Sequence, residues 1–225
     1  MKLLPEPEAL LLSLQLATVT VLLLLLLGTP LAWWLAFGRA RWKALVEAVV
    51  ALPLVLPPTV LGFYLLLAMA PDGILGRLWK TLFDGPLAFT FPGLVVASLI
   101  YSLPFVVQPL HNAFRSMGRA PLEAAWTLGS PPWRTFWNTA LPTCRHGFLT
   151  ATVLAFAHTL GEFGVVLMVG GNIPGETRVV SIAIYDQVES LAYGDAHRLS
   201  LLLLGLSFAV LLPVYWRGRR GGLLP

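Results

Sequence analysis

The sequence predicts an all-α integral membrane protein with five transmembrane helices. Hydrophobic residues make up 57% of the 225 residues and charged residues only 12%, whereas ordinary soluble domains carry roughly 25% charged residues. The apolar residues also form long blocks, because residues 10–37 contain no charged side chain and about 20 apolar residues suffice to cross a bilayer. A water-soluble fold of this size would need more charge on its surface, so we expect lipid around the chain.

Five segments are long and apolar enough to be spans: Ala9–Phe37, Val46–Ala70, Phe91–Leu110, Gly147–Val169 and Leu199–Trp216. The first is longer than the hydrocarbon core requires, so we expect it to tilt or to extend beyond the membrane. Prolines interrupt the second span at positions 53, 57 and 58, and the third at position 104. Prolines inside spans kink helices and need neighbours or water to satisfy the freed carbonyls. They fit a pathway lining and ordinary helix packing equally well, and both interpretations stay open.

Basic residues predict the orientation. With the N-terminus outside, ten of the fifteen lysines and arginines fall in the inner loops beside only two acidic residues. These ten are Arg39, Arg41, Lys43, Arg115, Arg119, Arg134, Arg145, Arg217, Arg219 and Arg220. The outer side holds the other five together with eight acidic residues. The positive-inside rule therefore predicts an outer N-terminus and an inner C-terminus, in agreement with an odd number of spans.

Two hydrophilic connections remain within what we interpret as one domain, residues 1–225 with a core of about 9–216. Residues 170–198 lie outside, and their stretch Arg178–Tyr193 mixes apolar and acidic residues as a short amphipathic helix does.

Residues 111–146 form the long inner loop. Within it, residues 121–129 start with a proline and close with a glycine, as a short helix does. Its apolar face either inserts into a groove of another protein or packs on this chain's own helices.

Several other classes of site are not supported by the sequence. The single cysteine, Cys144, excludes an intrachain disulfide and a cysteine-cluster metal site, and the four histidines are scattered without zinc-protease spacing. An intramembrane serine protease would need Ser98 or Ser102 to pair with His158, which is only a formal possibility. None of the three lysines follows a phosphate-binding loop. We therefore expect no catalytic residues, no metal, no cofactor and no nucleic acid bound by this chain.

The inner loop resembles the EAA loop of binding-protein-dependent ABC importer permeases. Glu123, Ala124 and Ala125, then Gly129, and finally Leu141 with Pro142 follow the spacing of that motif. Thr139 stands where isoleucine is usual, and it has a similar branched shape. The resemblance implies a type I ABC importer permease fold. It also implies that these six residues belong to a coupling loop that docks on a cytoplasmic ATPase, whose ATP hydrolysis drives alternating access.

Residues 52–60 and 172–178 resemble the molybdate permease subunits of this family, and residues 160–164 resemble a stretch that molybdate, tungstate and sulfate permeases share. The resemblance extends from about Glu8 to Trp216. It implies a multi-pass permease for molybdate in the cytoplasmic (inner) membrane of a prokaryote. Permeases for tungstate and for sulfate or thiosulfate are the alternatives, because these oxyanions are also tetrahedral. A secondary transporter is a remote alternative, since it would usually show more spans and inverted repeats.

Glu162 is the one acidic residue inside a predicted span. A carboxylate lining an anion pathway would repel its substrate, so we expect a structural role at a helix break between Gly161 and Gly164. Together with Phe163, these residues are our candidates for the pathway or gate. His158 lies one helical turn earlier and is in position to hydrogen-bond Glu162. A proton relay is the alternative for this pair.

Pro174, Gly175, Glu176, Thr177 and Arg178 are the candidates for facing an outer oxyanion-binding protein, by resemblance to the same family. Proline followed by glycine also marks a plain turn, and Arg178 with Thr177 offers a weak oxyanion contact. The expected partners include a second copy of the chain, because five spans make a thin bundle. Two cytoplasmic ATPase subunits, the outer binding protein and membrane lipid complete the set.

Overall fold

The computed structural model describes residues 6–220, with side chains described for residues 6–212. Expectations for the side chains of Trp216, Arg217, Arg219 and Arg220 therefore lie outside the described residues. The regular elements of the described part are helices. In chain order they are α1 (Pro7–Phe37), α2 (Lys43–Val55), α3 (Pro58–Met69), α4 (Ile74–Leu82), α5 (Phe91–Met117), α6 (Ala120–Thr127), α7 (Pro132–Thr135), the π-helix η1 (Phe136–Ala140), α8 (Leu141–Thr143), α9 (Arg145–Gly161), α10 (Gly164–Gly170), α11 (Val180–Glu189) and α12 (Tyr193–Arg220).

The all-α membrane fold that the sequence predicts is confirmed. Three helices are long and apolar enough to cross a membrane, namely α1, α5 and α12, the last over Tyr193–Leu212. Two further pairs pass the same test together but are bent, α2 with α3 by 113° and α9 with α10 by 59°. The described chain therefore has three to five spans. Helix α5 starts where the third predicted span starts and continues to Met117, so residues 111–117 of the expected loop are helical.

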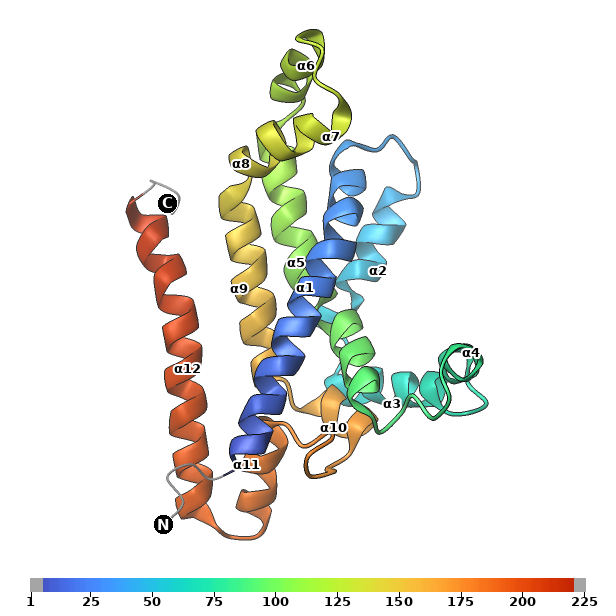
Figure 1. The fold of residues 1–225 in the computed structure, drawn as a ribbon, viewed down its shortest axis with the longest axis vertical. Coiled ribbons are helices and arrows are strands. Elements are labelled where there is room, and N and C mark those ends of the chain that lie inside the picture. The colour runs from blue at the N-terminus through green and yellow to red at the C-terminus, as the bar shows by residue number, and fades with distance from the viewer. Residues whose placement is uncertain (1–5, 221–225) are drawn as a thin grey trace.

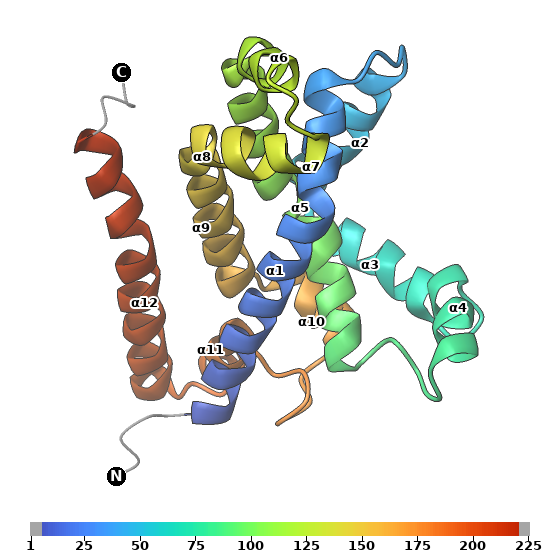
Figure 2. The ribbon, with the colours of Figure 1, turned by 45° about the horizontal axis from the view of Figure 1, so that its top comes forward.

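The bend between α2 and α3 follows from two consecutive prolines. Leu56 ends α2 with an extended backbone, the conformation that a following proline favours. Pro58 then occupies the first position of α3, where its missing N–H costs no hydrogen bond. The second predicted span is thus not one continuous helix. It consists of α2 along the bundle and α3 leading away toward α4 (Figure 2).

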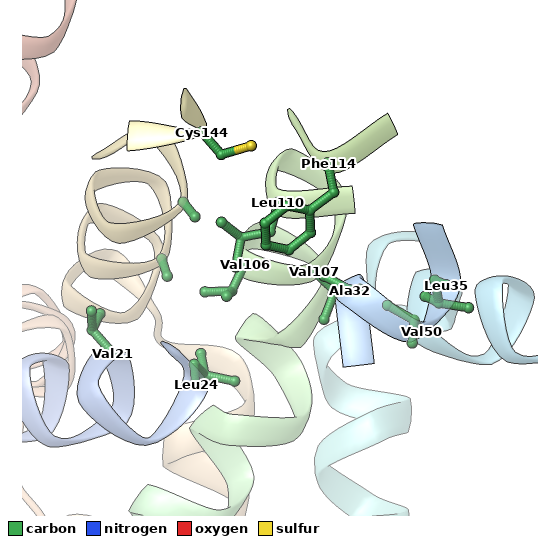
Figure 3. Close-up of a cluster of buried hydrophobic side chains, with 12 residues drawn as sticks. Val21, Leu24, Ala32, Leu35, Val50, Val106, Val107, Leu110, Phe114 and Cys144 are labelled. Atoms are coloured by element: carbon green, nitrogen blue, oxygen red, sulfur yellow. The ribbon is translucent and has the colours of Figure 1, made fainter. Parts of the chain in front are cut away.

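Helices α1, α5 and α9 form the centre of the fold and lie side by side (Figure 1). Their largest buried cluster surrounds Phe114 and draws residues from α1, α2, α5 and α9, with Cys144 at its edge (Figure 3). Phe114 is fully buried and meets Trp33 edge-on at a centroid distance of 5.1 Å. This cluster fixes the end of α1 against the end of α5, directly below the short helices α6 to α8.

Two opposite ends of the molecule follow from this packing. The α6 end carries α6, α7, α8 and the α1–α2 connection, and the α11 end carries α10 and α11 (Figure 1). Helix α11 falls within the predicted stretch Arg178–Tyr193, and it is tied to α1 because the Val180 amide donates to the Ser13 hydroxyl at 2.8 Å. Helix α12 contacts α9 and α11 and is the most exposed of the three long helices.

Candidate functional site

Helix α6 is the short helix that the sequence predicts within the inner loop. It ends in a Schellman motif, in which the Ser130 amide donates to the Ala125 carbonyl at 3.0 Å and the Gly129 amide donates to the Trp126 carbonyl at 2.9 Å. Gly129 has a φ of +78°, a left-handed conformation that glycine adopts without strain. The glycine of the motif therefore reverses the chain sharply at the end of α6.

One face of α6 attaches it to α1. Leu122 is only 1% exposed and lines a cavity of about 190 Å³ together with Trp33, Phe37 and Trp126. The Arg119 guanidinium also donates a hydrogen bond to the Phe37 carbonyl. The apolar face predicted for this helix is therefore divided, because Leu122 packs on the chain's own first helix.

The other face of α6 points away from the bundle. Glu123, Ala124, Trp126, Leu128 and Gly129 are exposed, Leu128 to 87%; we call these five residues the α6 surface. Apolar side chains with this exposure at the tip of a fold are typical of a surface that docks on another protein.

The six residues of the predicted coupling loop lie at two positions, four at α6 and two at α8. Glu123, Ala124, Ala125 and Gly129 belong to α6 or follow it directly, and Ala125 is half-buried. Leu141 begins α8 and lines an apolar groove beside α1, while Pro142 is exposed. Leu141 therefore lies against its own chain.

The break that the sequence predicts near Glu162 lies between α9 and α10. Helix α9 ends at Gly161 and α10 begins at Gly164. Gly164 lies against α3, since a Cβ there would stand 2.6 Å from Cβ of Pro58. The Phe163 ring packs on Tyr185 of α11 at a centroid distance of 4.9 Å. The four gate candidates therefore connect α9, α3 and α11.

The expected hydrogen bond between His158 and Glu162 is absent from the described structure. Helix α9 stops before Glu162, so the spacing of one helical turn no longer brings the two side chains together. Instead, His158 Nδ1 lies 3.0 Å from the Ser102 hydroxyl. Glu162 is 5% exposed, and neither oxygen of its carboxyl has a hydrogen-bond partner among the described residues.

The candidates at the α11 end differ in exposure. Pro174, Gly175 and Glu176 are exposed, whereas Thr177 is fully buried and its hydroxyl donates to the Gly170 carbonyl at 2.7 Å. Arg178 forms ion pairs with Glu6 at 3.2 Å and with Asp186 at 3.5 Å, and it also donates to Asn172 at 2.6 Å. Two carboxylates thus lie beside the Arg178 guanidinium and would compete with an oxyanion for it.

Sequence reasoning missed a crevice between α2, α5 and α9. It has a volume of about 500 Å³, and Gln108, Asn112 and Thr150 are its polar lining residues. The signal was available, because two amides four residues apart in an apolar helix stand on one face.

Comparisons with known proteins agree with this architecture. Residues 28–215 match the family described as "Binding-protein-dependent transport system inner membrane component". The chain is 58% identical to the "Molybdenum transport system permease protein ModB" of Azotobacter vinelandii over 92% of each chain. It is 38% identical to the protein of the same name from Escherichia coli (strain K12), over 96% of this chain and 94% of the relative. A "Probable sulfate transport system permease protein cysT" of Zygnema circumcarinatum is 37% identical, over 83% of this chain and 64% of the relative.

Among solved structures, the fold is similar to a bacterial ABC transporter involved in the import of the acidic polysaccharide alginate. The TM-score is 0.75 at 16% identity, covering 95% of this chain and 78% of that chain. A second structure of the alginate transporter, in complex with an alginate pentasaccharide-bound periplasmic protein, gives a TM-score of 0.73 at the same identity and coverage. At this identity the similarity shows the fold alone.

Proposed function

The chain belongs to the family of binding-protein-dependent transport system inner membrane components, and we propose that it is the membrane subunit of an ATP-driven molybdate importer. The observation that carries the proposal is the 58% identity to a molybdenum transport permease over 92% of both chains. The sulfate permease relative is less similar, and this chain covers only 64% of it. Molybdate is therefore favoured over sulfate as the substrate.

The α6 surface is the proposed contact with two cytoplasmic ATPase subunits, one for each copy of the chain. Its exposed Trp126 and Leu128 supply apolar area for a groove in the partner, and Ala124 allows close approach. The attachment of Leu122 and Arg119 to α1 supplies the mechanical link. A displacement of α6 by the ATPase acts on the end of α1 and, through the Phe114 cluster, on α5 and α9. ATP hydrolysis belongs to the partner in this proposal.

The α6 end is the cytoplasmic side in this proposal. The α1–α2 connection and the start of α9 both lie there (Figure 1), and they carry Arg39, Arg41 and Arg145. An accumulation of arginine at one end is typical of the cytoplasmic side. The α11 end then faces outward, with the exposed turn at Pro174, Gly175 and Glu176 toward an oxyanion-binding protein. The fold shared with an alginate transporter that binds a periplasmic protein supports such a partner.

The break between Gly161 and Gly164 is the proposed gate. It joins α9, which begins at the α6 end, to α10 at the α11 end. Because Gly164 packs directly on Pro58, a tilt of α9 also displaces the start of α3. In this proposal two copies of the chain face each other, and the oxyanion passes between them as their gates alternate.

Uptake of labelled molybdate tests the proposal, in cells that lack the chain and in the same cells after rescue. The proposal predicts loss of uptake without the chain, recovery on rescue, and resistance of that uptake to excess sulfate. Loss of sulfate uptake with normal molybdate uptake would refute the molybdate assignment and favour the sulfate permease. Uptake of both oxyanions that is independent of the chain would refute the transport function.

A further inference from the structure

The crevice between α2, α5 and α9 is lined by aligned faces of two helices. On α5, Tyr101, Phe105, Gln108 and Asn112 follow each other at spacings of four, three and four residues, which places them on one face of the helix. On α9, residues 147, 150, 154 and 158 follow at spacings of three, four and four. The two faces meet in the crevice, where Asn112 and Thr150 are both lining residues.

Lipid is a poor explanation for the polar side chains of this crevice. Gln108 and Asn112 are exposed in the structure, although α5 is one of the three helices able to cross a membrane. A polar group in hydrocarbon without a partner costs several kcal/mol, so such groups usually face a protein interior or a water-filled cavity. Helix α12 shows the contrast over residues 201–212, where the exposed large side chains are Leu201, Leu204, Phe208 and Leu212.

An aromatic stack adjoins the crevice on the side of the α11 end. Phe105 lines the crevice, and the His158 ring stacks on it at a centroid distance of 4.0 Å and an interplanar angle of 26°. His158 is held in place because its Nδ1 atom contacts the Ser102 hydroxyl, which in turn lies 3.0 Å from the Thr159 hydroxyl. A buried polar chain therefore positions the ring that supports Phe105.

The polar lining of this crevice consists of neutral side chains. None of its lining residues is charged, so no carboxylate repels an anion and no lysine or arginine holds it. A conduction site has to bind its ion strongly enough to admit it and weakly enough to release it. Amide and hydroxyl groups meet this requirement because they donate hydrogen bonds to an oxyanion and carry no charge of their own. A volume of about 500 Å³ also leaves room for hydrating water, at about 30 Å³ for each molecule.

We propose that Gln108, Asn112 and Thr150 form a transit site that hydrogen-bonds a tetrahedral oxyanion, and that Phe105, backed by His158, closes this site toward the α11 end. The assignment rests on the proposed function and specifies where the substrate passes. It places the transit site in the half of the bundle nearest α6, on the inner side of the gate at Gly161–Gly164.

The test uses the complete importer, reconstituted in proteoliposomes with its ATPase and its binding protein. Uptake of molybdate, tungstate and sulfate is measured beside ATP hydrolysis stimulated by the loaded binding protein. Thr150→Val removes the hydroxyl and Asn112→Leu removes the amide, while Thr150→Ser and Asn112→Gln keep these donor groups. Thr152→Val is the matched control, because it makes the same change on α9 at a hydroxyl that is bonded to the Phe148 carbonyl and does not line the crevice.

Each donor-removing variant is expected to lower uptake of the transported oxyanion about ten-fold, the usual effect of losing a hydrogen bond to a charged group. The donor-keeping variants and Thr152→Val are expected to stay within about two-fold of wild type, with stimulated ATP hydrolysis retained in all of them. Equal uptake by Thr150→Val and Thr152→Val would overturn the assignment. A donor-removing variant that loses uptake and also fails to pair with its second copy would overturn it too. So would one that loses both uptake and stimulated ATP hydrolysis. In either case these residues would be structural. A wild-type importer that moves none of the three oxyanions would refute the proposed function as well.

Discussion

Replacing Gly129 by valine tests the role of the α6 surface in ATPase binding. The φ of Gly129 is +78°, and a Cβ at this position would meet no other atom within 4 Å. The cost of a side chain is therefore backbone strain alone, about 1–2 kcal/mol for an L-residue in the left-handed region and highest for a β-branched one. If Gly129 must keep its left-handed conformation for α6 to enter the ATPase groove, this backbone strain weakens ATPase binding by about ten-fold.

The affinity of the solubilised chain for its ATPase measures this effect. Gly129→Asn is expected to bind more tightly than Gly129→Val, because asparagine tolerates the left-handed region better. Gly205→Val is the control, since a Cβ on this glycine of α12 would also meet no atom within 4 Å, while its backbone is that of an ordinary helix. Wild-type affinity of Gly129→Val, or an equal loss of affinity in Gly205→Val, would refute this role of the α6 end.

Three further changes test the packing that supports this site. Phe114→Ala empties the centre of the main cluster, and we expect it to lower the free energy of unfolding by about 3–5 kcal/mol, seen as an earlier thermal transition. Gly62→Val is expected to reduce the yield of folded protein, because even a Cβ at position 62 would stand 2.8 Å from Cβ of Met168; a normal yield would contradict the close contact of α3 with α10. Arg178→Ala is expected to change stability by about 1 kcal/mol, since its ion pairs are partly exposed, and to leave the preference among oxyanions unchanged. A shift in that preference would show that Arg178 contacts the substrate.

Apolar blocks and turn signals made the long helices and α6 predictable. The first predicted span agrees with α1 to within two residues at its start. The short helix over residues 121–129 agrees with α6 and its closing glycine, because its end signals are local. The prolines of the second span are also local signals, and they predicted that this span is interrupted. The size of the bend was not predictable, since it depends on how α3 packs against α10, a contact between segments about 100 residues apart.

Tertiary contacts explain the predictions that failed or changed. The His158–Glu162 pair assumed a continuous helix, but α9 ends at Gly161 and His158 turns to Ser102 on α5. The apolar face of α6 is only partly exposed, because Leu122 packs into a cavity at the end of α1. Periodicity shows which residues share a face, but it does not show which of them another segment covers.

ATP-dependent accumulation of molybdate tests the central claim most directly. The purified chain is reconstituted with its ATPase and binding protein, and molybdate inside the vesicles is measured with ATP, with a non-hydrolysable analogue, and with a proton gradient alone. Our account predicts accumulation only with ATP, and its loss when Glu123→Arg disrupts the α6 surface. Accumulation driven by the proton gradient without ATP would contradict it and would indicate a secondary transporter.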